Sequence, residues 1–143
     1  MGTPDYFLKP SDKRAIEALL WALKPLTNLR SSIPLPYATT FLMVALDEGK
    51  SVNAYARAVG INRFMMDRYI RNIGDRARNG DPGLGLVRIE RHPIYSNRRQ
   101  ILLTAKGQSL AKEIFQQMRR SDRRDANADD TQALHDRLRA KSL

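Results

Sequence analysis

Most of the side chains in this sequence that could take part in binding or catalysis are arginines in the middle of the chain. Between Lys50 and Lys106 there are twelve cations and four anions, so this stretch carries most of the net charge of +10. A concentrated basic field attracts phosphates, and arginine also binds guanine edges through paired hydrogen bonds. The middle of the chain is therefore the candidate working surface, and its charge favours a polyanion as partner.

The most regular group of these side chains follows a short turn at residues 60–62. They are expected on the first turn and outward stripe of one helix: Asn62, Arg63, Phe64, Asp67, Arg68 and Arg71. In a major groove, arginine can read guanine O6 and N7, and asparagine can read adenine or cap the helix. Asp67 could accept from cytosine N4, or pair with Arg63 or Arg71. A solvated helix face with ordinary ion pairs is the alternative interpretation.

A second basic group surrounds a turn farther along the chain. Arg91 and His92 precede the turn, and Arg98 and Arg99 follow it. These cations could reach the minor groove or its edges. The alternative is that Arg98 and Arg99 pair with Glu90 across a strand ladder, and the two roles are compatible.

Other chemistry has little support in the sequence. There is no cysteine, and the two histidines, His92 and His135, lack nearby carboxylates, so we expect no metal site and no catalytic dyad. Neither a Gly-x-x-x-x-Gly-Lys loop nor a Gly-x-Ser-x-Gly turn occurs. We expect a protein without a cofactor that is not an enzyme. No apolar run approaches the roughly 18 to 20 residues of a membrane span, and no leader pattern is present, so a cytoplasmic location is expected.

The elements that must position these residues follow from periodicity. Ser11 is expected to cap a first helix that Pro25 ends, and residues 29–36 form a connector. Further helices are expected at residues 37–47, 53–59 and 63–73, and strands at 86–91 and 100–103. The second helix should bury Phe41, Leu42 and Leu46. A last helix should open near Thr104 and bury Leu110, Ile114 and Met118, and Leu134 with Leu138 gives a weak signal for another.

Two short helices joined by a glycine-containing turn are the signal of a helix-turn-helix. Ala56 supplies the small residue where the helices cross, and Gly60 tolerates a positive φ. The second helix should bury Met66, Tyr69, Ile70 and Ile73. With a hairpin directly after it, the fold class is mainly α with a small β-hairpin wing: a winged helix-turn-helix with flanking N- and C-terminal helices.

The flanking helices carry more apolar residues than a small core can cover, which predicts a twofold interface. The residues assigned to it are Leu19, Trp21, Leu23, Leu110, Ile114 and Met118. The expected division is an N-terminal dimerisation helix and connector at 1–35, a DNA-binding core at 36–107, and a dimerisation helix with a polar tail at 108–143.

Several short stretches in the expected order resemble the multiple-antibiotic-resistance regulator (MarR) family. They are Ser51-Val52-Asn53-Ala54-Tyr55-Ala56, Gly60-Ile61, Gly85-Leu86-Val87, Arg98-Arg99 and Leu103-Thr104-Ala105-Lys106-Gly107. The Leu-Thr-x-x-Gly ending is the most specific of these, and the resemblance covers about residues 36–118. It implies homodimers built from the terminal helices, with recognition helices in successive major grooves of a pseudo-palindrome that often overlaps a promoter.

Two departures from the family pattern affect these expectations. Residues 75–84 form an extra basic, glycine-rich segment after the recognition helix. The acidic residue that usually precedes the wing arginine is replaced by Tyr95, so we expect a shorter or rebuilt wing. Family members often bind small aromatic effectors, but no polar constellation here marks such a pocket.

The sequence thus predicts a dimeric, sequence-specific DNA-binding transcription regulator of MarR-like type, a repressor acting on double-stranded DNA. Two alternatives use the same fold, because a fold does not determine a function. One is an architectural or plasmid-maintenance DNA binder with little sequence preference, and the other is an RNA-binding module.

Overall fold

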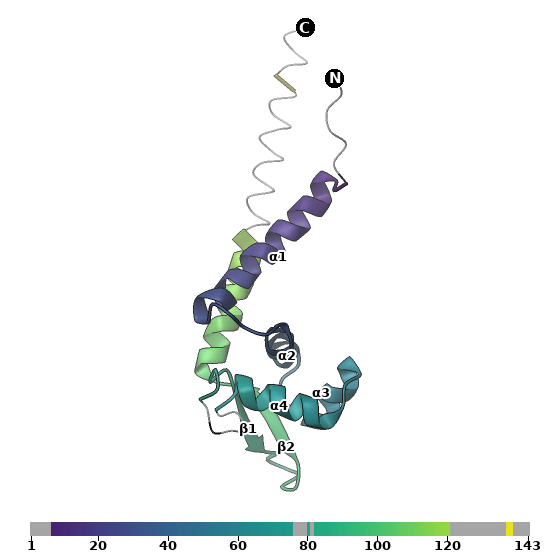
Figure 1. Cartoon of the computed structure of the whole chain (residues 1–143), viewed down its shortest axis with the longest axis vertical. Coiled ribbons are helices and arrows are strands. Elements are labelled where there is room, and N and C mark those ends of the chain that lie inside the picture. Colours follow the sequence, from purple (N-terminus) through teal and green to yellow (C-terminus); the bar gives the residue numbers. More distant parts are fainter. Residues whose placement is uncertain (1–6, 76–79, 81, 121–136, 139–143) are drawn as a thin grey trace. The chain divides into compact units, whose positions relative to one another are not determined.

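The structure, a computed structural model, describes residues 7–75, 80, 82–120 and 137–138. The chain divides into two compact units: Leu26–Lys112, and the remaining N- and C-terminal segments. The first unit contains a helix-turn-helix followed by a two-stranded hairpin, which is the winged-helix arrangement predicted above (Figure 1). A helix over 105–120 follows the hairpin. Most of the expected tail helix lies outside the described residues.

Helix α1 (Pro10–Leu29) corrects two expectations about its ends. It runs through Pro25 instead of ending there, and Pro25 is buried, as are Ala22 and Leu26 nearby. A proline inside a helix removes one backbone hydrogen bond, and burial on both sides of it offsets that loss. At the start, Pro10 takes the first helical position, where no N–H is needed, and the Asp12 carboxylate accepts from the Lys9 N–H at 3.1 Å. Asp12 therefore caps the helix, where Ser11 was expected to do so.

Helix α2 (Leu35–Leu46) begins and ends close to the prediction but buries a different face. Phe41 is fully buried as expected, whereas Leu42 is 40% exposed and Leu46 is 87% exposed. The buried side chains are instead Ala38, Thr40, Phe41 and Val44. The run from Phe41 to Leu46 is apolar at every position, so its periodicity does not identify the inward face.

Helices α3 (Val52–Val59) and α4 (Arg63–Ile73) form the predicted helix-turn-helix. The Ser51 hydroxyl accepts from the Ala54 N–H at 3.2 Å and caps α3, and Gly60 ends it with a φ of 71°. That left-handed conformation suits glycine, which has no Cβ to clash. The Ile61 N–H then returns to the Ala56 carbonyl at 3.1 Å. This tight turn sets the angle at which α4 leaves α3.

Strands β1 (Val87–Arg91) and β2 (Arg99–Leu103) pair antiparallel, as predicted, with Val87 opposite Leu103 and Ile89 opposite Ile101. The α2–α3 connection joins the same ladder, because the Gly49 N–H binds the Ile101 carbonyl and the Ile101 N–H binds the Lys50 carbonyl. The hairpin is thereby fixed to the start of the helix-turn-helix.

The Leu-Thr-x-x-Gly stretch closes the winged unit through backbone contacts. The Thr104 hydroxyl donates to the Gly85 carbonyl at 2.6 Å and accepts from the Gly107 N–H at 3.1 Å, so it caps the helix over 105–120. A Cβ at Gly107 would collide with the Leu86 carbonyl, which explains the glycine. The motif is thus the joint between the wing and the last helix.

The helix over 105–120 buries Leu110 and Ile114 as expected, but Met118 is 45% exposed and Phe115 is 52% exposed. The expectation that Met118 is buried within the chain was wrong. Among the described residues, none of the helices combines the length and apolar content of a membrane span.

Candidate nucleic-acid interface

Helix α4 presents two opposite faces. Met66, Ile70 and Ile73 are at most 1% exposed and lie against the core. Phe64, Arg68 and Arg71, spaced at i, i+4 and i+7, are all exposed on the opposite side. Tyr69, which we expected to be buried, is only half-buried at the edge between the faces. The outward face is available to a partner.

The polar residues at the start of α4 have defined roles. Asn62 is the N-cap, and its side-chain oxygen accepts from the Met65 N–H at 2.9 Å. Because this oxygen is occupied, the capping role that the sequence allowed for Asn62 is the one the structure contains. Arg63 is exposed directly after it.

Asp67 pairs with Arg71, one of the partners that the sequence left open. The Arg71 Nε donates to the Asp67 carboxylate at 2.8 Å, one helical turn away. The carboxylate holds Arg71 along the helix and neutralises part of its charge. Arg68 has no such neighbour at i−4, since that position holds Phe64.

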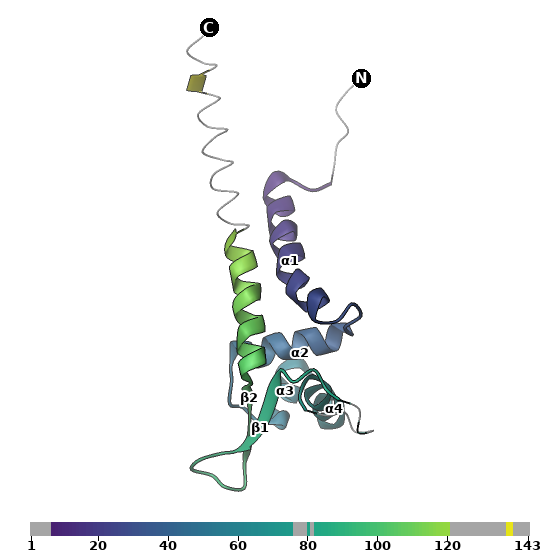
Figure 2. The ribbon, with the colours of Figure 1, turned by 90° about the vertical axis from the view of Figure 1, so that its left-hand side faces the viewer.

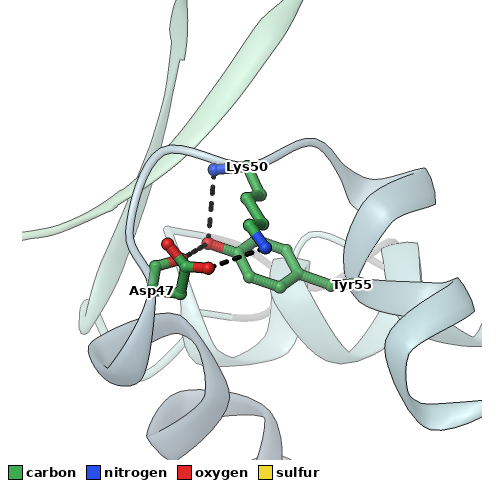
Figure 3. Close-up of polar contacts among 3 residues, drawn as sticks. All are labelled: Asp47, Lys50 and Tyr55. Atoms are coloured by element: carbon green, nitrogen blue, oxygen red, sulfur yellow. Dashed lines mark hydrogen bonds and ion pairs between the residues drawn. The ribbon is translucent and has the colours of Figure 1, made fainter.

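A buried tyrosine fixes α3 to the turn that precedes it (Figure 3). Tyr55 is 1% exposed, its hydroxyl donates to the Asp47 carbonyl at 2.6 Å, and it accepts from the Lys50 N–H at 3.4 Å. Burial is the main cause that raises the pKa of Tyr55 above 10.0, although the hydrogen bond from Lys50 opposes it. The Lys50 ammonium reaches the Asp47 carboxylate at 2.6 Å beside it.

Two contacts that the sequence analysis missed position α4 and the wing. The Asn72 amide near the end of α4 donates to the Tyr37 hydroxyl at 2.7 Å, and Tyr37 also packs against the Tyr69 ring. Glu48 accepts from the Leu103 N–H at 2.7 Å, which ties the α2–α3 connection to β2. Both contacts join residues more than 30 positions apart, so no local pattern could have indicated them.

The segment after α4 returns along the end of that helix. The N–H groups of Leu84, Gly85 and Leu86 donate to the carbonyls of Asn72, Gly74 and Ile73, respectively, at 2.8 to 3.0 Å. A Cβ at Gly83 would collide with the Gly74 carbonyl, so the close approach requires glycine there. These bonds satisfy carbonyls that a helix end leaves free.

The wing loop extends beyond α3 and α4 (Figure 2). Arg91 lies directly opposite Arg99 in the ladder, and both are exposed. Two like charges in this position destabilise a hairpin by themselves, and a polyanion would relieve the repulsion. Glu90 forms its ion pair with Arg88 on the same strand, and not with Arg98 or Arg99 as the alternative interpretation required.

An aromatic cluster organises the tip of the wing. The His92 Nδ1 accepts from the N–H groups of Ile94 and Tyr95 at 3.2 and 3.1 Å, and its ring lies 5.2 Å from that of Tyr95. The Arg98 guanidinium lies 4.9 Å from the centre of the Tyr95 ring. An aromatic ring therefore holds Arg98 at the tip of this wing, and a wing that is shorter or rebuilt relative to the family pattern stays a prediction.

An apolar cavity of about 280 Å³ lies between α2 and the helix-turn-helix. Its walls are Leu35, Pro36, Thr39, Thr40, Met43, Val59, Ile61, Met66 and Tyr69. No charged side chain lines it. The inner side of α4 is therefore not fully packed against α2.

The residues expected at a dimer interface fall into three groups by exposure. Leu19 and Met118 are about half exposed, while Trp21 and Leu23 are half-buried. Leu110 and Ile114 are already buried within the chain. On α1, Ile16 and Leu20 are exposed together with Leu19. The interface residues predicted from the sequence included Leu19 but not Ile16 or Leu20.

No protein-family model and no curated protein matches this sequence. Solved structures of similar fold include the transcriptional regulator Tm0710 from Thermotoga maritima, with a TM-score of 0.64 at 9% identity over 89% of this chain and 84% of that one. A MarR transcriptional regulator from Methanosarcina mazei Go1 has a TM-score of 0.52 at 13% identity, over 89% and 92% of the two chains. Reduced AbfR bound to DNA has a TM-score of 0.50 at 15% identity, over 88% and 86%. The chain has the winged-helix fold of MarR-like regulators, as its sequence predicted.

Proposed function

We propose that this protein is a transcription regulator that binds duplex DNA, with α4 in the major groove and the wing along the phosphates. The observation that carries the proposal is the outward face of α4, where Arg68 and Arg71 are exposed opposite a fully buried Met66, Ile70 and Ile73. A helix held in this way can enter a groove without disturbing the core. The similar fold of AbfR, which was solved bound to DNA, supports the same partner.

The wing adds a contact of a different kind. Arg91, Arg98 and Arg99 are exposed at the end of the hairpin, beyond the core. Cations in this place interact with phosphates or enter the narrow minor groove, so they add affinity and fix the orientation of the protein. In this proposal Arg63, exposed at the start of α4, contacts the DNA backbone or a base edge.

We further propose that the active form is a homodimer acting as a repressor on a pseudo-palindromic operator. Exposed Ile16, Leu19 and Leu20 on α1 are the apolar surface that supports it. Two recognition helices about 34 to 36 Å apart would then enter successive major grooves. Occupation of such a site over a promoter would block transcription.

The test begins with selection of bound fragments from genomic DNA, followed by footprinting and binding titrations. Arg68→Ala should weaken specific binding by about 1 to 3 kcal/mol, because a bidentate base or phosphate contact is lost. Lys112→Ala, which removes an exposed cation outside α4 and the wing, is the matched control. Equal affinity of wild type and Arg68→Ala for the selected site would contradict the assigned face.

Two alternatives are separated by the same preparation. An RNA-binding module would prefer structured RNA over duplex DNA in a competition titration. An architectural DNA binder would give diffuse protection instead of a discrete footprint. The regulator should give a discrete protected palindrome and a log affinity that falls steeply with log salt concentration.

A further inference from the structure

Phe64 is an apolar side chain in an unusual position. It is the second residue of α4 and is 78% exposed, although the opposite face of the helix buries Met66, Ile70 and Ile73. A phenylalanine ring left in water loses the favourable transfer that burial would give it. Nothing in the winged unit explains this exposure, so the ring is available for a partner.

The face of α4 on which Phe64 lies indicates what the ring contacts, if the proposed function holds for this helix. Phe64 shares one face of α4 with Arg68 and Arg71, at i, i+4 and i+7, and its position in the first turn is the part of a recognition helix that reaches base edges. A helix that inserts these arginines into the major groove therefore inserts the ring with them. There, the apolar group that a base pair presents is the C5-methyl of thymine.

The polar side chains next to Phe64 are already engaged in contacts within α4. The Asn62 oxygen is bound to the Met65 N–H, and the Asp67 carboxylate is bound to Arg71. Both of these oxygens are engaged within the helix, so a base contact through either of them competes with a bond already formed. The exposed side chains that remain there are those of Arg63, Phe64 and Met65, and of the two apolar ones Phe64 is the more exposed, at 78% against 43%.

We infer that Phe64 is a specificity-determining residue that packs against the methyl group of a thymine in each half of the bound DNA site. This inference rests on the proposed function and deepens it, because it names a chemical feature of the DNA that the protein distinguishes. The ring makes no hydrogen bond, so its contribution comes from contact with the methyl group and from exclusion of water.

The test replaces thymines of the selected site by deoxyuridine, one position at a time in both half-sites. This change removes the methyl group and leaves base pairing intact. At one position, the replacement of thymine by deoxyuridine should weaken wild-type binding by about fourfold per half-site. This is the loss expected for one buried methyl group. In Phe64→Ala the same substitution should have no effect, and Phe64→Leu should retain part of it.

The control variant is Leu46→Ala, which removes an equally exposed apolar side chain at the end of α2. It should keep the full loss of affinity on deoxyuridine substitution. Both variants change exposed residues, and thermal unfolding should confirm that they fold. Placing 5-methylcytosine at the sensitive position, paired with guanine, tests whether the methyl group alone restores part of the affinity.

The outcomes separate this inference from the proposed function. Specific binding that is equally sensitive to deoxyuridine in wild type and Phe64→Ala, or insensitive in both, would overturn the role of Phe64 and leave the proposed function in place. Loss of dimerisation by Phe64→Ala would assign the ring to a second copy of the chain and also overturn the inference. If the wild type binds no duplex DNA, both conclusions fail.

Discussion

At the scale of single residues, the position of the helix-turn-helix depends on a few polar contacts that are partly shielded from water. Tyr55 is the clearest case, because this buried side chain joins α3, through its hydroxyl, to the carbonyl of Asp47 and the N–H of Lys50 at a partly buried site. A buried polar group that loses its partner costs more than the hydrogen bond contributes. Tyr55 therefore acts with the Ser51 cap and the backbone bonds to Ile101 in fixing the start of the helix-turn-helix.

Replacing Tyr55 by Phe should lower the free energy of unfolding by about 1 to 3 kcal/mol, because the Asp47 carbonyl and the Lys50 N–H lose their buried partner. Urea titration followed by circular dichroism measures the change. Tyr95→Phe, which removes an exposed hydroxyl, is the matched control and should leave stability unchanged. A Tyr55→Phe protein as stable as wild type would show that the contact contributes nothing.

The same residue predicts how stability depends on pH. Burial raises the pKa of Tyr55 above 10.0 in the folded protein, so the folded state binds this proton more tightly than the unfolded state. Its contribution is complete below pH 10 and declines as the pH rises from 10 towards the folded pKa. Urea midpoints between pH 8 and 11 should fall more steeply for wild type than for Tyr55→Phe. Parallel curves would contradict the raised pKa.

At the scale of elements, the wing depends on a cluster of aromatic rings. His92 is bound to the backbone N–H groups of the turn, stacks with Tyr95, and the Tyr95 ring holds Arg98. An arginine side chain that is already held in place before binding loses less conformational entropy on binding than a freely rotating one. The shape of the turn therefore determines where the wing places its charge.

Tyr95→Ala should weaken DNA binding about two- to fivefold, the range expected from losing an exposed cation–π contact of about 0.5 to 1 kcal/mol. Tyr95→Phe keeps the ring and should bind as wild type does. Ile94→Ala, beside it on the same exposed turn, is the control for a general effect of shortening a side chain. Fluorescence anisotropy at fixed salt measures all three. Equal losses for Tyr95→Phe and Tyr95→Ala would show that the ring does not position Arg98.

At the scale of the whole molecule, two kinds of surface lie on different parts of the chain. The surplus of positive charge is concentrated in the helix-turn-helix and the wing, whereas α1 carries the exposed apolar side chains Ile16, Leu19 and Leu20. A charged surface suits a polyanion, and an apolar surface suits a second protein surface. This division is the physical basis for proposing one homodimer that binds one duplex.

Leu19→Glu combined with Leu20→Glu should separate the dimer, because two buried carboxylates in an apolar interface are strongly unfavourable. Sedimentation equilibrium should then give the mass of one chain in place of two, and specific DNA affinity should fall sharply because a single recognition helix remains. Leu46→Glu, at an exposed position outside α1, is the control. A wild-type protein that is monomeric at micromolar concentration would contradict the proposal.

The sequence by itself determined the order of elements and the outward face of α4. Patterns within a few residues of each other carry both: Gly60 marks the turn, Asn62 was a candidate cap, and the 3.6-residue period separates Met66 and Ile70 from Arg68 and Arg71. The alternating residues around Ile89 likewise identify a strand. These features are local, so they can be predicted from the sequence without knowledge of packing.

Only the tertiary structure decided which face of α2 is buried, that α1 continues through Pro25, and which partner Asp67 takes. It also decided that Tyr55, Asn72 and Glu48 hold the site together. Each of these outcomes depends on competition between several neighbours, some of them distant in the sequence. A periodic pattern in the sequence indicates which residues favour burial. Which of them are buried depends on how the whole chain packs.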